Sequence, residues 1–484
     1  MNAPIRKLGM VIAFLFTTLL VSTTIVQGFQ AQAINARPDN RRTLLSTYGA
    51  DRGAILVEST PVALSEETDN QYQRIRRYPE GSVYAPVTGY FSFLFGAGGG
   101  LERAENPLLN GSSDRLFYRR VSDVFAGQRP RGVNIETTIH AAAQRAAVQG
   151  LGTNRGAAVA LDPRTGAILA LASSPSYDPN VLASHDMAAV QTAWDDLNAA
   201  ETKPMLNRAL SETYPPGSTF KLVTAAAAIS TGRYDMESEL DAPQVLDLPQ
   251  TSVGLPNFGG RACDPSGKQT MIEAMRISCN TAFASLGLQL GDDVIRDQAA
   301  RFGIGDSLRV PMSVARSSFP DDLDPPSLAQ SAIGQRDVRV TPLQMAMVSA
   351  AIANRGIVMR PYLVETVLGN DLSVIDQAPT QQLSEAISPE VASQLSLMMQ
   401  RVVESGTGQP AQIPGVAVAG KTGTAEVGGD QRGHAWFTAF APAGDPQVAV
   451  AVVVENQGDN QSVAGGGRVA GPIAKAIMEA VLGS

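Results

Sequence analysis

The N-terminal segment is the feature that most limits how this chain can fold. Residues 8–26 carry no charge, and Arg6 and Lys7 come directly before them. A helix over this segment covers about 28 Å, enough to cross the hydrocarbon core of a membrane. Because basic residues lie only at its start, the positive-inside tendency leaves residues 1–7 in the cytoplasm. We therefore expect a single-pass transmembrane anchor in the cell membrane, with the rest of the chain extracytoplasmic.

A cleaved signal peptide is the other interpretation of this segment. Ala31-Gln32-Ala33 resembles a small-residue cleavage site, which leaves that alternative open. The apolar region of a signal peptide usually has about 7–15 residues, so the longer run here favours an uncleaved anchor. No second apolar run in the sequence is long enough to cross a membrane, which argues against a protein with several membrane spans.

The amino-acid composition argues against a nucleic-acid-binding protein and against a structural zinc site. Lys and Arg number 38 against 46 Asp and Glu, for a net charge of −8, whereas a nucleic-acid-binding domain usually carries a basic patch. The chain has two cysteines and three histidines: His140, His185 and His434. No cluster with the spacing of a structural zinc site can be assembled from them, so we expect neither a metal nor a cofactor.

The sequence pattern divides the part of the chain that is expected outside the membrane into two domains. Residues 36–150 are irregular, with short strand-like runs at Ala54–Val57 and Ser82–Tyr84, and they predict a small, loop-rich, non-catalytic N-terminal domain. Residues 151–484 contain longer periodic segments and predict one catalytic domain.

The catalytic domain is predicted to be α+β. Its strand candidates are Ala157–Asp162, Ala167–Ser173, Val416–Val427, His434–Ala441 and Gln447–Glu455. Helical patterns cover Thr137–Val148, Thr219–Ser230, Ile272–Leu290, Leu343–Ala353 and Val469–Leu482. Two strands, a helical middle, three strands and a final helix suggest a five-stranded antiparallel sheet covered by helices on both faces.

The segment Tyr214-Pro-Pro-Gly-Ser-Thr-Phe-Lys221 is the richest in possible chemistry. Ser218 and Lys221 lie three residues apart at the start of an apolar helix, so they share a helix face. Burial and the positive end of the helix dipole both lower the pKa of such a lysine, which can then deprotonate a serine hydroxyl. A capping serine followed by an ordinary lysine remains the alternative, because this short pattern is common.

Two later segments make the pattern specific. Ser278-Cys279-Asn280 comes after Ser218 in the chain, and Lys421-Thr422-Gly423-Thr424 comes after both. The ordered set resembles the penicillin-recognising serine acyltransferases, which include penicillin-binding proteins and serine β-lactamases.

Further stretches resemble class B penicillin-binding proteins, and one is typical of an actinobacterial subgroup. They are Asp51-Arg52-Gly53, Gly100-Leu101-Glu102, Leu161–Gly166, Thr341–Gln344 and Ser331–Asp337, where Arg336 stands in place of a common glycine. The resemblance covers about residues 36–484. It implies a peptidoglycan D,D-transpeptidase that forms an acyl-serine intermediate from D-Ala-D-Ala and takes part in cell wall synthesis.

The resemblance also implies roles for the catalytic side chains. Ser218 would attack the carbonyl carbon of D-Ala-D-Ala, and Lys221 would take its proton. The backbone N–H groups of Ser218 and Thr424 would bind the oxyanion. Ser278 would pass a proton to the leaving amine.

The remaining motif residues would bind substrate in this family. Asn280 would hold a substrate amide, and Lys421, Thr422 and Thr424 would bind the terminal carboxylate. Gly423 would let the substrate lie against its strand as an added edge. β-Lactam antibiotics would acylate Ser218.

Other functions compete with this interpretation. Gly415–Thr422 matches a phosphate-binding loop letter for letter, but its Val-Ala-Val-Ala stretch alternates like a strand and no helix is expected after it. A serine β-lactamase is disfavoured because no Glu-x-x-Leu-Asn segment lies between Ser278 and Lys421. A D,D-carboxypeptidase stays open. A non-catalytic β-lactam sensor is the alternative from a different functional class.

Cys263 and Cys279 enclose a short segment, and Cys279 lies between two candidate site residues. Because the domain is expected outside the membrane, we predict a disulfide that stiffens the 278–280 loop. Two buried, reduced thiols are the alternative.

The partners follow from the resemblance. It implies peptidoglycan stem peptides as donor and acceptor, a membrane-embedded glycan polymerase, division proteins, and an N-terminal domain of the pedestal or dimerisation type. No nucleic acid is expected.

Overall fold

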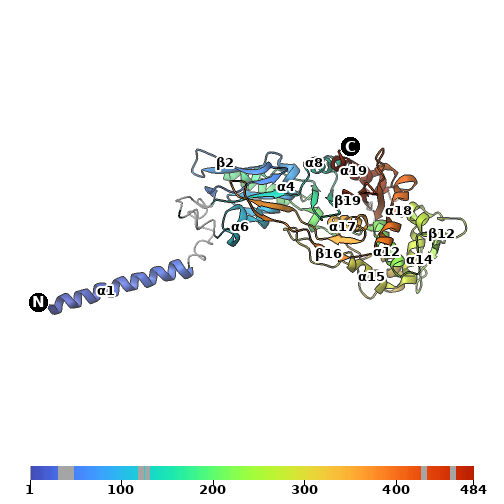
Figure 1. The fold of residues 1–484 in the computed structure, drawn as a ribbon, viewed down its shortest axis with the longest axis horizontal. Helices are drawn as coiled ribbons and strands as arrows, with labels where there is room; N and C mark the ends of the chain where they lie inside the picture. The colour runs from blue at the N-terminus through green and yellow to red at the C-terminus, as the bar shows by residue number, and fades with distance from the viewer. Residues whose placement is uncertain are drawn as a thin grey trace.

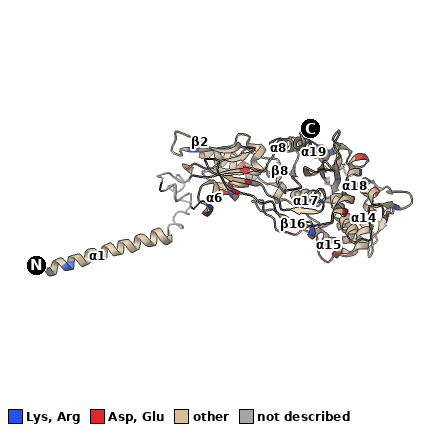
Figure 2. Cartoon of the chain, viewed as in Figure 1, with Lys and Arg blue, Asp and Glu red and all other residues tan. Residues whose placement is uncertain are grey.

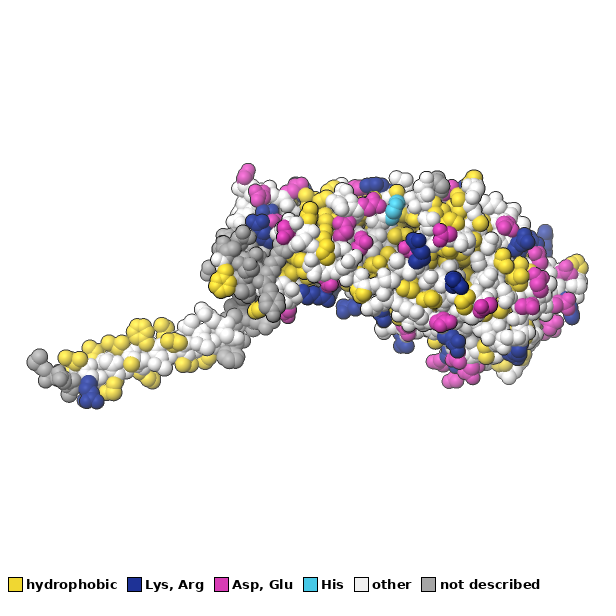
Figure 3. Space-filling view, in the orientation of Figure 1, with side chains coloured by type: hydrophobic (Ala, Val, Ile, Leu, Met, Phe, Trp, Pro, Cys, Tyr) yellow, Lys and Arg dark blue, Asp and Glu magenta, His cyan; other side chains and the backbone are white. Residues whose placement is uncertain are grey.

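A computed structural model of the chain describes residues 2–30, 48–117, 125, 131–426, 433–457 and 465–483. Helix α1 (Asn2–Thr24) continues into a π-helical turn (Ile25–Gln30). Residues Pro4–Gly28 are apolar enough to span a membrane, with a mean hydropathy of 2.1 and no part buried. Figure 2 shows charge on α1 only near its N-terminus, and Figure 3 shows hydrophobic side chains along the rest. The predicted apolar helix is confirmed, while Ala31-Gln32-Ala33 lies outside the described residues.

The central sheet has five antiparallel strands in the order β17-β18-β19-β7-β8. The strands are β7 (Gly156–Leu161), β8 (Ile168–Ser174), β17 (Ala419–Ala425), β18 (His434–Ala441) and β19 (Val448–Val454). Every residue of β19 is buried, which requires cover on both faces of the sheet. The predicted five-stranded sheet is confirmed.

Helices cover this sheet on both sides (Figure 1). Helices α8 (Ala141–Leu151) and α19 (Gly465–Leu482) pack together and against the sheet, and α17 (Pro342–Ala353) packs against β7, β18 and β19. Residues 342–352 of α17 are all buried. The helix is apolar all round because neighbouring elements surround it.

The stretch predicted as one helix over Ile272–Leu290 is two helices. Helix α13 (Met271–Ile277) ends at Ser278, whose φ of 62° is left-handed, and α14 (Asn280–Leu290) begins after Cys279. The apolar pattern continues across the break, so hydrophobic periodicity alone did not show that the helix is interrupted at Ser278 and Cys279.

The N-terminal domain is more regular than predicted. Its six-stranded sheet has the order β15-β14-β6-β1-β2-β3. The strands are β1 (Ile55–Val57), β2 (Thr60–Glu67), β3 (Arg74–Arg77), β6 (Asn134–Thr137), β14 (Val364–Leu368) and β15 (Val374–Gln377). Residues 364–377 come from the expected catalytic domain and lie beside the N-terminal strands (Figure 1). The sheet therefore extends beyond residues 36–150.

The strand-like run Ser82–Tyr84 was a wrong prediction, because it lies in helix α4 (Gly81–Thr88). Tyr84, Ala85 and Val87 are buried in the hydrophobic core. A short apolar run fits either a strand or a buried helix, and tertiary packing decides between them here.

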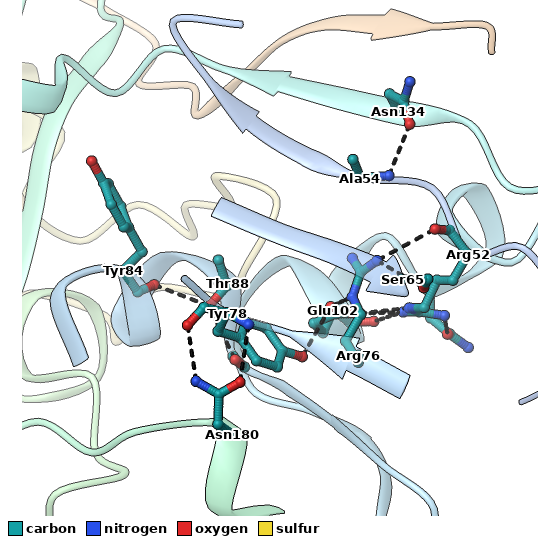
Figure 4. Close-up of polar contacts among 12 residues, drawn as sticks. Arg52, Ala54, Ser65, Arg76, Tyr78, Tyr84, Thr88, Glu102, Asn134 and Asn180 are labelled. Atoms are coloured by element: carbon teal, nitrogen blue, oxygen red, sulfur yellow. Dashed lines mark hydrogen bonds and ion pairs between the residues drawn. The ribbon is translucent and has the colours of Figure 1, made fainter. Parts of the chain in front are cut away.

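A buried ion cluster holds the N-terminal domain together (Figure 4). Glu102 is fully buried, and its two carboxylate oxygens accept hydrogen bonds from Arg52 Nε at 2.6 Å and Arg76 Nε at 2.7 Å. Tyr78 donates its hydroxyl to the same carboxylate at 3.1 Å. Burial alone would raise the pKa of Glu102, but the two guanidinium groups outweigh it and lower that pKa. The Asp51-Arg52-Gly53 and Gly100-Leu101-Glu102 stretches thus meet in one structural cluster.

Replacing this carboxylate should be costly. The Glu102→Ala substitution leaves two guanidinium groups buried without a counter-charge, so we expect a loss of about 3–5 kcal/mol in the free energy of unfolding. Urea unfolding of the detergent-solubilised full chain measures it. The control is Glu80→Gln, which removes an exposed pair with Arg145 and should cost about 0–1 kcal/mol. Equal effects of the two substitutions would contradict this account.

Candidate active site

Ser218 lies in a tight turn at the head of a buried helix. The 3₁₀ turn Gly217–Phe220 leads directly into α12 (Lys221–Ser230), whose residues 221–229 are all buried. Gly217 has a φ of 54°, and a Cβ there would lie 2.5 Å from the carbonyl oxygen of Thr424. Only glycine therefore lets this turn approach β17. Ser218 itself is partly exposed, so its hydroxyl can be reached from solvent.

Lys221 is fully buried one turn after Ser218. Its Nζ donates to the carbonyl oxygen of Ser278 at 2.8 Å and to Asn280 Oδ1 at 2.7 Å, and lies 3.4 Å from Ser278 Oγ. Among the described residues no hydrogen bond joins Nζ to Ser218 Oγ. Burial, and then the charge of Lys421, hold the pKa of Lys221 well below its ordinary value.

Lys421 also contacts the hydroxyl of Ser278. It is fully buried on β17, and its Nζ donates to Ser278 Oγ at 2.8 Å and to the carbonyl oxygen of Thr422 at 3.0 Å. Burial lowers the pKa of Lys421 to about 7. Within the described ranges neither lysine forms an ion pair with a carboxylate. Two neighbouring buried ammonium groups oppose each other's charge, which favours release of one proton at neutral pH.

The break between α13 and α14 presents Ser278 and Asn280 to these lysines. The predicted disulfide is present: Cys263 and Cys279 have their Cα atoms 6.0 Å apart. Because Cys279 is bonded, its side chain does not cap α14. Asn257 does so from a distant loop, where its Oδ1 accepts from the backbone N–H groups of Asn280 and Thr281, each at 3.0 Å. The 257–263 loop is thus tied to the Ser278–Asn280 segment by both a cap and a covalent bond.

Strand β17 forms the other wall of the site. The cavity beside Ser218 is lined by Ser218, Phe258, Ser278, Asn280, Ile333, Gln335, Thr422, Gly423, Thr424 and Glu426. Thr424 Oγ1 is buried without a hydrogen-bond partner in the described part of the chain. Thr422 Oγ1 lies 2.6 Å from the hydroxyl of Thr407, a residue that the motif search did not identify.

Gly423 lines the Ser218 cavity, and its missing side chain also matters for packing. A Cβ at this position would lie 2.9 Å from the carbonyl oxygen of Pro216 and 3.0 Å from side-chain atoms of Thr219 and Trp436. The missing side chain therefore lets β17 pack against the turn that carries Ser218.

The phosphate-binding-loop interpretation of Gly415–Thr422 is excluded by the fold. Gly420, Lys421 and Thr422 lie in β17, paired with β18, and the strand continues to Ala425. A phosphate loop requires a helix at that point.

The three histidines have structural contacts. His434 is buried on β18, packs edge-on against Tyr214 and accepts from the backbone N–H of Asn456 at 3.2 Å. His140 caps α8, and His185 contacts Asn70. None of them lines the Ser218 cavity, as expected for lysine-based chemistry.

The structure thus brings together every residue that the motifs identified. The residues that the motifs missed are Asn257, Phe258, Thr407 and Glu426. Ile333 and Gln335 lie in the Ser331–Asp337 stretch but had no role assigned to them.

The disulfide leads to a direct prediction. Alkylation of the denatured chain without reductant should add no label, and alkylation after reduction should add two. Intact mass spectrometry measures both. In the chain-entropy model a loop of this size contributes about 3 kcal/mol, so Cys263→Ser should lower the melting temperature. Two labelled thiols before reduction would contradict the bond.

Asn257 should act through its acceptor oxygen. Asn257→Ala removes the cap of α14, so we expect faster amide exchange in residues 278–284 and a cost of about 1 kcal/mol. Asn257→Asp keeps an acceptor at the same place and should protect these amides as the wild type does. Hydrogen–deuterium exchange mass spectrometry compares the two variants. Equal amide exchange rates in the two variants would contradict the proposed role of Asn257 Oδ1.

Comparisons with known proteins agree with this geometry. Residues 156–479 match the penicillin-binding protein transpeptidase domain, and residues 52–135 match the penicillin-binding protein A dimerisation domain. The chain is 46% identical to peptidoglycan D,D-transpeptidase PbpA of Mycolicibacterium smegmatis, covering 100% of this chain and 99% of that protein. It is 45% identical to PbpA of Mycobacterium tuberculosis strain H37Rv, with the same coverage.

Solved structures show the same similarity. The ceftriaxone acyl-enzyme complex of penicillin-binding protein A from M. tuberculosis matches with a TM-score of 0.86 and 44% identity, covering 90% of this chain and 100% of that one. The resemblance expected from the motifs is confirmed over residues 52–135 and 156–479. With its serine–lysine site on a five-stranded sheet, the chain belongs to the penicillin-binding protein transpeptidase family.

Proposed function

We propose that this chain is a peptidoglycan D,D-transpeptidase that uses Ser218 as its nucleophile and is acylated by β-lactams. The observation that supports this best is the hydroxyl of Ser278 between two buried lysines, beside an accessible serine and an edge strand. The relatives named D,D-transpeptidases and the acyl-enzyme structure of penicillin-binding protein A support the same reaction.

In the first step, Lys221 accepts the proton of Ser218 while Oγ attacks the carbonyl carbon of the penultimate D-alanine. Because burial and the charge of Lys421 lower the pKa of Lys221, the lysine can act as a base at neutral pH. The backbone N–H groups of Ser218 and Thr424 stabilise the negative oxygen of the tetrahedral intermediate.

In the second step, the terminal D-alanine leaves. Ser278 relays a proton to its amine, because the Ser278 hydroxyl contacts both lysines. Lys421 also attracts the substrate's terminal carboxylate, together with the hydroxyls of Thr422 and Thr424. The buried, unpaired hydroxyl of Thr424 supports this assignment. Asn280 holds the peptide amide and orients Lys221 through its Oδ1.

The acyl-enzyme is then resolved by the amine of a neighbouring stem peptide. That amine attacks the ester carbonyl, loses its proton to the lysine pair and releases Ser218, which forms the cross-link. A β-lactam follows only the first half, because its leaving amine stays attached and blocks the acceptor.

The anchor and the N-terminal domain suggest where the enzyme works. Helix α1 fits a single-pass anchor, which leaves residues 1–7 cytoplasmic and the catalytic domain extracytoplasmic. The residues matched by a dimerisation-domain model, 52–135, form a non-catalytic platform next to it. We include in the proposal a membrane glycan polymerase and division proteins as partners of this part of the chain.

A product assay tests the function. The full chain in detergent is incubated with a D-Ala-D-Ala pentapeptide and an acceptor peptide amine, and the products are followed by mass spectrometry. We expect release of D-alanine together with a cross-linked dimer. Hydrolysed tetrapeptide alone would indicate a D,D-carboxypeptidase, and sustained turnover of a chromogenic cephalosporin would indicate a β-lactamase. Acylation without any peptide turnover would indicate a sensor.

Covalent labelling tests the assigned residues. Ser218→Ala should abolish labelling by a fluorescent penicillin, and Lys221→Ala should slow it by about 10²–10⁴-fold because the base is lost. In-gel fluorescence of the purified chain measures both. The matched control is Ser211→Ala, an exposed serine shortly before the site, which should label as the wild type does. Covalent labelling of Ser218→Ala would disprove the assignment.

A further inference from the structure

A second cavity opens from the Ser218 site. It has a volume of about 690 Å³ and lies between the loop around residues 248–260 and the segment 330–339. It shares five lining residues with the Ser218 cavity: Phe258, Asn280, Ile333, Gln335 and Glu426. A peptide attached to the reacting D-alanine can therefore continue from one cavity into the other.

The charges that line this cavity have mostly one sign. Arg336 and Arg339 face it from the 330–339 segment, and Glu426 is the carboxylate among its lining residues. Neither arginine forms an ion pair with a described carboxylate. Nε and Nη2 of Arg336 lie 3.3 and 3.2 Å from the hydroxyl of Ser327, a neutral partner. The cavity thus presents two guanidinium groups and one carboxylate, and Asp324 lies close enough to Arg336 for their charges to interact.

The backbone conformation at Arg336 suggests that its charged side chain has a function. Its φ is 63°, a left-handed conformation that is strained for a residue with a side chain. Glycine would adopt this conformation without strain. Nη1 of Arg339 donates to the carbonyl oxygen of Arg336 at 2.7 Å and to that of Val338 at 3.0 Å. Arg339 therefore braces the turn that presents Arg336.

We propose that this cavity binds the donor stem peptide through a free carboxylate upstream of D-Ala-D-Ala, with Arg336 as the main binding residue. A guanidinium group forms paired hydrogen bonds with a carboxylate, which gives orientation as well as attraction. The inference rests on the proposed transpeptidase function and adds a preference for donors that carry this charge. Stem peptides offer two such groups: the α-carboxylate of a γ-linked D-glutamate and the side-chain carboxylate of a diaminopimelate at the third position.

The test uses three synthetic pentapeptide donors ending in D-Ala-D-Ala. One carries both carboxylates, one has the D-glutamate carboxylate amidated, and one has the diaminopimelate carboxylate amidated. For the wild-type full chain we expect kcat/KM to fall about 10–150-fold for one amidated donor, as for the loss of a hydrogen bond between charged groups. The donor that loses activity identifies which carboxylate is bound.

Variants connect that preference to Arg336. Arg336→Gly removes the guanidinium and relieves the backbone, so it should fold, and Arg336→Gln keeps a polar side chain. Both should bring the ratio of kcat/KM for free and amidated donors to about 1, because the charge that distinguishes the donors is gone. The control is Arg164→Gln, an exposed arginine paired with Asp162 and outside this cavity, which should keep the wild-type ratio.

The outcomes separate this inference from the proposed function. Equal use of all three donors by an active wild type, or an unchanged ratio in Arg336→Gly, would overturn the carboxylate site while transpeptidation stands. Failure of the wild type to be acylated by benzylpenicillin would instead overturn the proposed function, and that assay requires none of these peptides.

Discussion

The hydroxyl of Ser278 is held between two buried lysines, and the rest of the site depends on this contact. Lys421 reaches it at 2.8 Å from strand β17, and Lys221 lies at 3.4 Å on helix α12. Three parts of the chain that are far apart in sequence must therefore be placed within hydrogen-bond range of one another. The five-stranded sheet fixes β17, the turn at Gly217 seats α12 against it, and the break between α13 and α14 presents Ser278.

This arrangement explains how the chain does acyl-transfer chemistry without a histidine in the site. A lysine is a poor base in water because its ammonium form is strongly favoured. Here burial disfavours that form, and a second buried ammonium group disfavours it further. Within the described residues no carboxylate is paired with either lysine, so no counter-charge offsets the cost of burying the two ammonium groups. In the proposed mechanism, the same pair serves two purposes: Lys221 is the base for the nucleophile, and Lys421 is a positive charge for the substrate carboxylate.

Much of this could be predicted from the sequence. The five strands are mostly apolar runs of strand length, and three short motifs in order indicate Ser218, Ser278 and Lys421 without any coordinates. The disulfide was predicted from two cysteines in a domain that is expected outside the membrane. What failed depends on contacts between distant segments. Asn257 caps α14 from a loop that precedes helix α13, and no local pattern marks an asparagine as a remote cap.

Two other features also depend on contacts between distant segments. Strands β14 and β15 join the N-terminal sheet from residues 364–377, although sequence order placed them in the catalytic domain. Gly423 lacks a side chain because the Ser218 turn packs there, a reason that only the folded chain reveals. Local periodicity predicts elements, whereas pairing and close approach are decided by tertiary packing.

The two buried lysines are expected to release one proton at neutral pH, so that one of them is an uncharged base. The pH dependence of acylation measures this. The second-order rate constant for acylation of the full chain by benzylpenicillin reports the ionisation of the free enzyme. As the pH falls, a proton returns to the lysine pair and the base is lost, so the rate should fall. We expect the midpoint of that fall far below the ordinary lysine value of about 10.4, because burial and the charge of Lys421 lower the pKa of Lys221. A midpoint at or above about pH 10 would show two independent, fully charged lysines with ordinary pKa values and contradict the account.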